Sequence, residues 1–237
     1  HPEETSELFK DCLISVTSFF RDPDAYTILE EDCLPHIFEG KGRNDLVRVW
    51  VTGCATGEEA YSIAMQLAER AALMNEPPRL QVFATDLDEE AIAFARRGSY
   101  STNIVKDIRK QRLQRFLEQG DNGYTVKPEI REMVLFAVHD LLKDPPFSRL
   151  DLICCRNVLI YFNREAQEKV FDIFHYALNP KGYLFLGSSE STDSAAELFA
   201  VLNKHCHLYQ RRLQLSLPHR RLPSAALAAL GGRIPER

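Results

Sequence analysis

The stretch LVRVWVTGCATGEEAYSIAMQLAE, residues 46–69, decides the fold. Residues 46–52 are mostly β-branched or aromatic, which predicts a strand. From residue 58 to about residue 73, apolar side chains recur at helical spacing, which predicts a helix. The segment between them begins with Gly53 and ends with Gly57, so a strand passes through a tight glycine turn directly into a helix.

The segments that follow repeat this arrangement. Residues 80–85 predict a second strand that ends at Asp86, and the next helix continues to Arg97 and stops at Gly98. Two strand–helix units in succession predict an α/β protein with a parallel sheet and right-handed crossovers. Further elements of the same kind are predicted as strands at 150–155, 182–187 and 206–211, and as helices at 164–178 and 195–203.

Other elements lie outside this alternation. They are predicted as helices at 3–20, 25–36 and 108–117, and as a hairpin-like element with its turn at 120–123 and strands at 124–127 and 133–138. Pro23 separates the first two helices, because proline is tolerated in the first turn of a helix and not in its interior. We expect residues 213–237 to form a linker or tail.

Composition excludes several classes of protein. The 237 residues carry 29 Lys and Arg against 34 Asp and Glu, a net charge of −5. Without a basic excess the chain cannot coat nucleic acid, because it would release too few counterions. No apolar run approaches the roughly 20 residues that span a bilayer, and the polar, acidic start is unlike a signal peptide. We expect a globular, cytoplasmic protein without membrane insertion. Because it starts at His1, we also expect a piece of a longer chain.

The cysteines predict free thiols rather than disulfides. They are Cys12, Cys33, Cys54, Cys154, Cys155 and Cys206, and none forms a CxxC pair. His205, Cys206 and His207 lie too close together in the chain for a tetrahedral ligand set. We therefore expect no metal site.

The glycine turn indicates a ligand site. Glycine allows a ligand to approach the backbone, and the helix N-terminus that follows offers free N–H groups. The spacing of Gly53 and Gly57 matches neither the dinucleotide fingerprint nor a phosphate loop that ends in Lys-Ser/Thr. Glu58 and Glu59 also disfavour a pyrophosphate and favour a ligand with a cationic centre. Taken alone, the pattern fits an ordinary tight turn equally well.

Asp86 favours a nucleoside as the ligand. At the carboxyl end of the second strand, an acid can accept both hydroxyls of a ribose. It can also cap the following helix, although Asp88 is equally placed for that role. Together, the glycine turn and the acid describe a site for a nucleoside without phosphates. S-adenosylmethionine is the commonest ligand of that kind.

Four motifs in the right order identify a family. They are VTSFFRD (16–22), WVTGCATGEEAYSIA (50–64), FATDLD (83–88) and CRNVLIYF (155–162). With them the chain resembles the CheR-type chemoreceptor glutamate methyltransferases, up to about Arg212. The resemblance implies a Rossmann-like class I methyltransferase fold, doubly wound, with an antiparallel last strand. It implies that residues 1–40 are the remnant of an N-terminal helical domain and that residues 41–212 form the methyltransferase domain. Within that domain, it implies that residues 119–138 form a small β-subdomain inserted in the sheet.

The resemblance also implies the residues of the site. Arg21 and Tyr161 correspond to active-site residues that would hold the incoming carboxylate. Contacts with S-adenosylmethionine are implied for Ser15, Thr17, Arg21, Gly53, Glu59, Asp86, Asp140, Leu141, Asn157 and Val158. Of these, Glu59 corresponds to the acid that faces the amino group of the cofactor, and Asp86 to the acid that binds the ribose. Asp140 and Leu141 correspond to the pair that contacts the adenine. Ser15 and Asp140 stand where relatives also carry asparagine.

The implied activity is methyl transfer from S-adenosylmethionine to glutamate side chains of chemoreceptor cytoplasmic helices, in chemotaxis signal transduction. Glutamate is ionised at pH 7, with a pKa of about 4.3, so no general base is needed. The implied partner is a chemoreceptor or a similar signalling protein. The turn at 119–123 looks shorter than in members that bind a tethering pentapeptide, so we expect no such binding. We also expect a monomer that binds no nucleic acid.

Two alternatives stay open at this point. A nicotinamide-dependent oxidoreductase has a similar sheet, but Glu58, Glu59 and the lack of a pyrophosphate site argue against it. A non-catalytic or regulatory module of a multidomain signalling protein would keep the fold and the cofactor. Arg21 and Tyr161 favour an enzyme over such a module.

Overall fold

The computed structural model describes residues 17–213. The predictions for residues 1–16, including Ser15, and for the tail after residue 213 lie outside the described residues. The helices are α2 (Pro23–Ile28), α3 (Leu34–Phe38), α4 (Glu58–Ala71), α5 (Glu89–Arg97), α6 (Lys110–Phe116), α7 (Pro128–Arg131) and α8 (Arg164–Ala177), together with the π-helical turn η1 (Leu29–Cys33) and the 3₁₀ turns η2 (Thr102–Lys106), η3 (Leu159–Tyr161) and η4 (Asp193–Ala195). The strands are β1 (Leu46–Thr52), β2 (Arg79–Asp86), β3 (Ser99–Tyr100), β4 (Leu117–Gly120), β5 (Gly123–Val126), β6 (Val134–Val138), β7 (Leu150–Cys155), β8 (Leu178–Leu186), β9 (Phe199–Asn203) and β10 (Leu208–Arg211).

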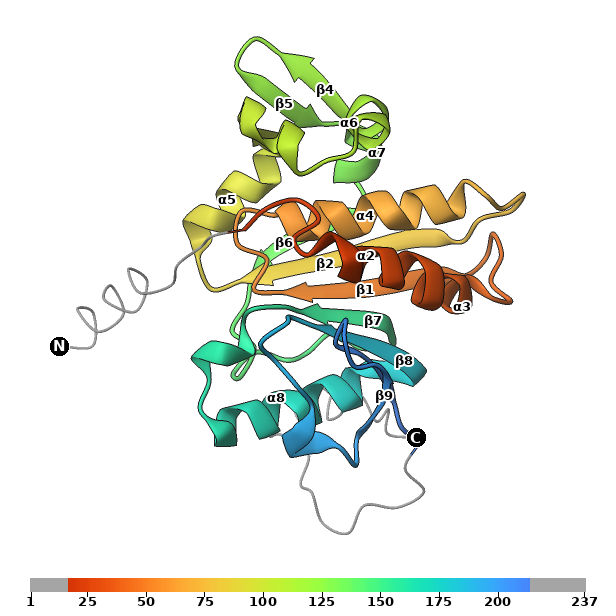
Figure 1. The fold of residues 1–237 in the computed structure, drawn as a ribbon, viewed down its shortest axis with the longest axis vertical. Coiled ribbons are helices and arrows are strands. Elements are labelled where there is room, and N and C mark those ends of the chain that lie inside the picture. The colour runs from red at the N-terminus through yellow and green to blue at the C-terminus, as the bar shows by residue number, and fades with distance from the viewer. Residues whose placement is uncertain (1–16, 214–237) are drawn as a thin grey trace, which may run out of the picture.

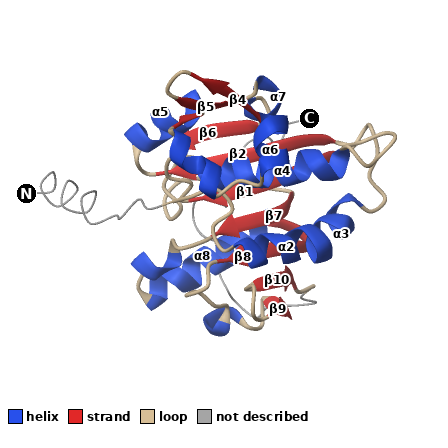
Figure 2. Ribbon diagram, turned by 45° about the horizontal axis from the view of Figure 1, so that its top comes forward, coloured by secondary structure: helices blue, strands red, loops and turns tan. Residues whose placement is uncertain are grey.

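Seven strands form the main sheet, in the order β6-β2-β1-β7-β8-β10-β9 (Figure 2). The first five in this order pair in parallel, and β10 is antiparallel to both β8 and β9. The sheet is therefore mostly parallel with an antiparallel last strand, which confirms the predicted fold class. The chain proceeds from β1 to β2 and β6 on one side, and later to β7 and β8 on the other. Ligands of open α/β sheets bind at such a reversal, outside the carboxyl ends of the strands.

Helices cover both faces of this sheet (Figure 1). In β1, Val47, Val49 and Val51 pack on the face covered by α2, α3 and α4, whereas Trp50 packs on the face covered by α8. All four side chains are fully buried. A strand buried on both faces is a continuous apolar run, which is why residues 46–52 show little alternation.

A smaller three-stranded sheet, in the order β3-β5-β4, lies near α6 and α7 (Figure 1). A single cation ties this region to two distant segments. Arg112 on α6 donates to the Glu69 carboxylate on α4 at 2.7–3.0 Å and to Glu30 in η1 at 2.7 Å. Its guanidinium also lies 4.7 Å from the centre of the Phe20 ring. Arg112 itself is buried, whereas 44% of the Glu30 side chain and 23% of the Glu69 side chain are exposed.

The prediction of a hairpin strand at 133–138 is wrong. The strand β6 lies in the main sheet, parallel to β2. The hairpin instead joins β4 to β5 across the predicted turn, and β3 pairs with β5 on the other side. The small sheet therefore lies between residues 99 and 126, rather than at 119–138. A β-rich segment has the same local pattern whichever strand it pairs with, because the partner is set by tertiary contacts.

Two helix predictions are also wrong in part. Residues 195–203 are expected to be helical, but β9 occupies their second half and pairs with β10. The pairing is antiparallel and extends from Phe199 opposite Arg211 to Asn203 opposite Leu208. Thr17 to Phe20 are not helical either, because the chain turns there and Phe20 has a φ of 50°.

The helix predicted at 25–36 extends from Pro23 to Phe38 as α2, η1 and α3. The π-helical turn precedes Pro35, whose nitrogen carries no hydrogen for an ordinary helical bond. The five cysteines between residues 17 and 213 are buried free thiols, as predicted. In the same part of the chain, no helix combines the length and the apolar character needed to cross a membrane.

Candidate active site

A cavity of about 350 Å³ lies at the carboxyl ends of β1, β2 and β7. Its lining consists of Thr17, Arg21, Thr52, Gly53, Ala55, Glu59, Thr85, Asp86, Leu87, Asp88, His139, Asp140, Leu141, Arg156, Asn157, Val158, Ile160, Tyr161 and Phe162. Every residue predicted for the site belongs to this lining, except Ser15, which lies outside the described residues. Five stretches far apart in the sequence thus meet where the strand order predicts a ligand.

The glycine turn brings the ends of β1 and β7 together. Gly53 and Gly57 have φ values of 62° and 94°, in the left-handed region that favours glycine. A Cβ atom on Gly53 would overlap the Val158 side chain, so glycine at this position lets the two turns approach. A Cβ atom on Gly57 would lie 2.8 Å from the Cβ atom of Ala95 on α5. Backbone therefore forms this wall of the cavity.

Asp86 fixes the same turn from the end of β2. Its Oδ2 accepts a hydrogen bond from the Ala55 N–H at 2.8 Å, and its Oδ1 accepts one from the Asp88 N–H at 2.9 Å. The Asp88 side chain caps α5 by accepting from the N–H groups of Glu90 and Ala91. Asp88 therefore takes the capping role that the sequence leaves open for either acid. Since a carboxylate has about four lone-pair sites, each oxygen of Asp86 can accept one more bond from a ligand.

Glu59, in the first turn of α4, is a buried acid beside a cation. Its carboxylate lies 3.6 Å from the Arg156 guanidinium, and 14% of its side chain is exposed. Burial, with a smaller contribution from the Glu190 carboxylate, raises the pKa of Glu59 to about 7, against the opposing charges of Arg156 and Arg21. A carboxyl with that pKa is about half protonated at neutral pH. A ligand ammonium beside it would favour the ionised form.

Arg156 holds the turn that carries Arg21. Its guanidinium donates to the Arg21 carbonyl oxygen at 3.0 Å and to the Asp22 carboxylate at 2.6 Å, and it lies over the Phe185 ring. The two neighbours of Arg21, Phe20 and Asp22, both have positive φ values, of 50° and 61°. This conformation is unfavourable for residues other than glycine. The bonds from Arg156 offset that strain and keep Arg21 at the cavity.

Two further predicted residues have distinct surroundings. Tyr161, in η3, has 43% of its surface exposed, so it is accessible to a large substrate. Asp140 accepts from the Leu142 N–H at 3.0 Å and pairs with Lys143 at 2.8 Å. Partial burial acts to raise the pKa of Asp140, but the hydrogen bonds from Lys143 and the Leu142 N–H, together with the charge of Lys143, outweigh it and hold the pKa below its usual value. Asp140 is therefore an ionised acceptor at neutral pH.

Sequence reasoning assigned no role to several residues of this region. Arg156 stands inside one of the four motifs, but only the structure shows its bonds to the Arg21 turn. His139 and Thr85 line the cavity and contact Trp50, whose indole N–H donates to Thr85 Oγ1 at 2.9 Å. Glu190 lies more than 30 residues from the loop that it contacts, so no local pattern identifies it.

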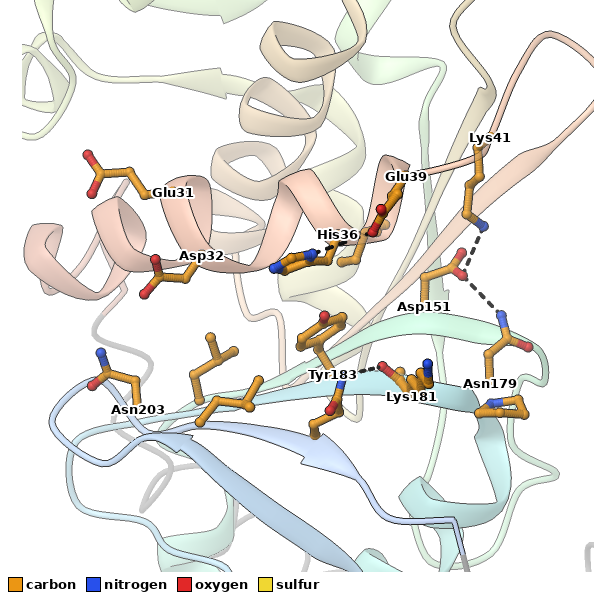
Figure 3. Close-up of a pocket in the computed structure, with 16 residues that line it drawn as sticks. Glu31, Asp32, His36, Glu39, Lys41, Asp151, Asn179, Lys181, Tyr183 and Asn203 are labelled. Carbon is orange, nitrogen blue, oxygen red and sulfur yellow. Dashed lines mark hydrogen bonds and ion pairs between the residues drawn. The ribbon is translucent and has the colours of Figure 1, made fainter.

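Two larger hollows lie elsewhere, of about 760 and 690 Å³. The first lies between the α2–η1–α3 helix and the strands β8 and β10, and Figure 3 shows Lys41 and Asn179 meeting there at the Asp151 carboxylate, each at 3.0 Å. It is at the amino end of β7, and none of the predicted site residues lines it. The second borders the small sheet and shares Thr17 with the 350 Å³ cavity.

Comparisons with known proteins agree with this geometry. A family described as "CheR methyltransferase, SAM binding domain" matches residues 15–207. An uncharacterized 104.1 kDa protein of Rhodobacter capsulatus is 42% identical over 207 residues, which are 87% of this chain and 22% of that protein. The putative methyltransferase Cher3 of Pseudomonas putida is 34% identical, over 80% of this chain and 70% of the relative. The chemotaxis protein methyltransferase of Escherichia coli is also 34% identical, over 85% of this chain and 69% of the relative.

The chain thus spans about a fifth of one relative and about two thirds of the others. The match to the family covers all four motifs noted in the sequence. It also covers every strand of the main sheet apart from β10, and the whole cavity lining. By this match the chain belongs to the CheR methyltransferase family, of which it contains the S-adenosylmethionine-binding domain.

Proposed function

We propose that this protein transfers the methyl group of S-adenosylmethionine to glutamate side chains in the cytoplasmic helices of chemoreceptors. The products are glutamate methyl esters and S-adenosylhomocysteine. The observation that carries the proposal is one cavity, in a chain of this family, that gathers the acids Asp86 and Glu59 with Arg21 and Tyr161. A non-catalytic module would need the two acids but not the other two residues.

The cavity residues fit an adenosyl ligand that carries an amino-acid group. Asp86 can accept from both ribose hydroxyls, and Asp140 with Leu141 can contact the adenine. Glu59 can pair with the ammonium group, which would replace the proton that burial favours on its carboxyl. Further contacts are assigned to the remaining predicted residues, which are Ser15, Thr17, Gly53, Asn157 and Val158.

The chemistry needs positioning rather than proton transfer. The sulfonium of the donor supplies an electrophilic methyl group. A carboxylate oxygen of the substrate forms the new bond to that carbon, and the electrons of the carbon–sulfur bond stay on sulfur. We assign to Arg21 and Tyr161 the task of holding the carboxylate in line with that bond. Holding two reactants in register can contribute about 7–11 kcal/mol to the lowering of a barrier.

The test is transfer of a labelled methyl group from S-adenosylmethionine to receptor cytoplasmic fragments. The expected product is a carboxyl methyl ester, which releases methanol in base. A matched fragment with glutamine at the target positions should accept no label. Tight binding of S-adenosylhomocysteine without any transfer would instead favour the non-catalytic module.

Binding of S-adenosylhomocysteine should strengthen as the pH rises from 6 to 8. The pKa of Glu59 is about 7 without a ligand, so its carboxyl loses its proton in this range and then attracts the ligand ammonium. Calorimetry at several pH values measures the effect. The affinity of the Glu59→Gln variant should not depend on pH in this range. The affinity of the wild type for 5′-methylthioadenosine, which lacks the ammonium, should not depend on pH either. A profile that persists in Glu59→Gln would remove Glu59 from this role.

The same pKa has the opposite effect on the protein without ligand. The folded-state pKa of Glu59 lies above the ordinary value of 4.5, so the folded state binds more protons between about pH 4.5 and 7. Its contribution to stability is therefore present at low pH and is lost as the pH rises through 7.

Trp50 should report occupation of the cavity. It is the single tryptophan of the chain, fully buried, and it contacts Thr85 and His139 in the lining. We expect a saturable change in its fluorescence on titration with S-adenosylhomocysteine. Adenosine 5′-monophosphate serves as the control, because Glu58 and Glu59 disfavour a phosphate. A signal that stays flat while calorimetry shows binding would place the ligand away from this wall.

The remaining proposals concern partners and location. We propose that the protein is a monomer and that it acts in the cytoplasm. We also propose that it does not bind a tethering pentapeptide, since only two residues separate Gly120 from Gly123 at the β4–β5 turn. Calorimetry with such a peptide tests this, and saturable micromolar binding would contradict it.

A further inference from the structure

Glu190 is a buried carboxylate bonded entirely to backbone. It follows β8, and 4% of its surface is exposed. Its Oε1 accepts from the N–H groups of Val158 and Leu159 at 2.8 and 2.7 Å, and its Oε2 accepts from those of Asn157 and Gly187 at 2.9 and 2.8 Å. Three of the four donors belong to consecutive residues of one loop, and that loop lines the cavity.

The loop after β7 turns sharply at its start. Asn157 has a φ of 60°, a left-handed conformation that asparagine tolerates better than most residues. A second side chain also holds this loop: Gln167 of α8 donates to the carbonyls of Leu159 and Phe162. Glu190 thus binds the N–H groups of the loop while Gln167 binds its carbonyl groups.

The chain is built to bring Glu190 close to this loop. A Cβ atom on Gly187 would lie 2.8 Å from the Asn157 nitrogen and 2.9 Å from Glu190 Oε2, so only glycine fits there. His207, in the turn before β10, contacts the Glu190 carbonyl oxygen through Nδ1 at 2.5 Å. The segments that follow β8 and precede β10 therefore support a side chain that accepts three of its four bonds from the cavity loop.

A carboxylate suits this position better than any neutral side chain. Its two oxygens offer about four lone-pair sites, which match the four N–H donors. Glutamine has the same shape but only one carbonyl oxygen, and its amide N–H groups would face two donors. Two backbone N–H groups would then lose their partners, which destabilises the loop because a buried donor without a partner is unfavourable.

We infer that Glu190 is a positioning residue, which sets the backbone of residues 157–159 so that Asn157 and Val158 meet the cofactor and Tyr161 meets the substrate carboxylate. Tyr161 follows within η3, which begins at Leu159, one of the residues that Glu190 holds. The inference rests on the proposed function, because it concerns how the same cavity binds its cofactor.

The test compares Glu190→Gln with a matched variant at the other end of β7. Asp151 is also a buried carboxylate that accepts from backbone, through the Arg48 N–H at 2.9 Å, but it lies outside the cavity lining. Asp151→Asn therefore controls for loss of stability. We expect Glu190→Gln to weaken S-adenosylhomocysteine binding about tenfold, because the unpaired N–H donors let Asn157 and Val158 move away from the ligand. Asp151→Asn should leave that binding unchanged.

Two further measurements separate positioning from stability. The amide hydrogens of residues 157–159 should exchange faster in Glu190→Gln than in Asp151→Asn, at temperatures well below unfolding. The loss of S-adenosylhomocysteine affinity at acid pH should also begin at a lower pH in Glu190→Gln than in the wild type. The groups that act on Glu59 are Arg156, Arg21 and Glu190, and removing the charge of Glu190 lowers the pKa of Glu59. Should Glu190→Gln fail to fold, Gly187→Ala disturbs the same contact without a change of charge.

The outcomes distinguish the inference from the proposed function. Failure of the wild type to bind S-adenosylhomocysteine would overturn the proposed function. Binding by the wild type, with Glu190→Gln and Asp151→Asn equal in affinity, amide exchange and pH profile, would overturn the inference alone.

Discussion

Replacing Asp86 with alanine is expected to weaken the binding of S-adenosylhomocysteine at least about 100-fold. Two hydrogen bonds from ribose hydroxyls to a carboxylate are each worth about 1.5–3 kcal/mol, and every 1.4 kcal/mol is a tenfold change in affinity. The substitution also removes the acceptors for the N–H groups of Ala55 and Asp88, so the glycine turn loses support as well. Calorimetry with the ligand and a melting curve measure the two effects separately.

Asp45→Ala is the matched control for this variant. Asp45 precedes β1, accepts from the Gly42 N–H at 2.9 Å, and lies outside the cavity lining. It should lose a little stability and keep its affinity. Asp86→Asn, which retains one carbonyl acceptor, should fall between the wild type and Asp86→Ala. An affinity in Asp86→Ala close to that of Asp45→Ala would show that the ribose is bound elsewhere.

Replacing Arg21 with alanine should lower turnover by about 10²–10³, because a fixed charged donor at the reacting group is worth that much in comparable sites. Turnover at saturating S-adenosylmethionine measures this effect. Affinity for S-adenosylhomocysteine should fall much less, since Asp86 and Glu59 stay in place. Arg21→Lys keeps the charge but loses the planar fork, so its turnover should recover only in part.

Arg164→Ala serves as the control for Arg21→Ala. Arg164 is an exposed arginine whose contact is a helical ion pair with Glu168 at 3.3 Å. Exposed pairs of this kind contribute little to stability, so Arg164→Ala should match the wild type in stability and in turnover. Unchanged turnover in Arg21→Ala would exclude Arg21 from the residues that act on the substrate.

The sequence predicts the central part of the fold because local patterns determine it. Residues 46–52 have the composition of a strand, and apolar side chains at helical spacing follow the turn from Gly53 to Gly57. The edges of the sheets are different. The segments that form β6 and β9 are short and β-rich or ambiguous, and only their partners β2 and β10 decide where they lie.

The candidate site divides in the same way. Asp86 and Glu59 are predictable because each follows a strand or opens a helix at a fixed place in a motif. Glu190 is not, because its bonds to the loop at Asn157 exist only after β7 and β8 pair. The role of Arg156 is likewise a matter of packing, since it depends on Asp22, more than 130 residues earlier in the chain.

The ion pairs of Arg112 with Glu30 and Glu69 bear on the mobility of the segment before α2. Arg112 is buried, whereas 44% of the Glu30 side chain and 23% of the Glu69 side chain are exposed, so separating these ions costs less than it would in a dry core. Because Arg112 also lies against the ring of Phe20, the neighbour of Arg21, we expect the Arg21 side of the cavity to keep its shape when the cavity is empty.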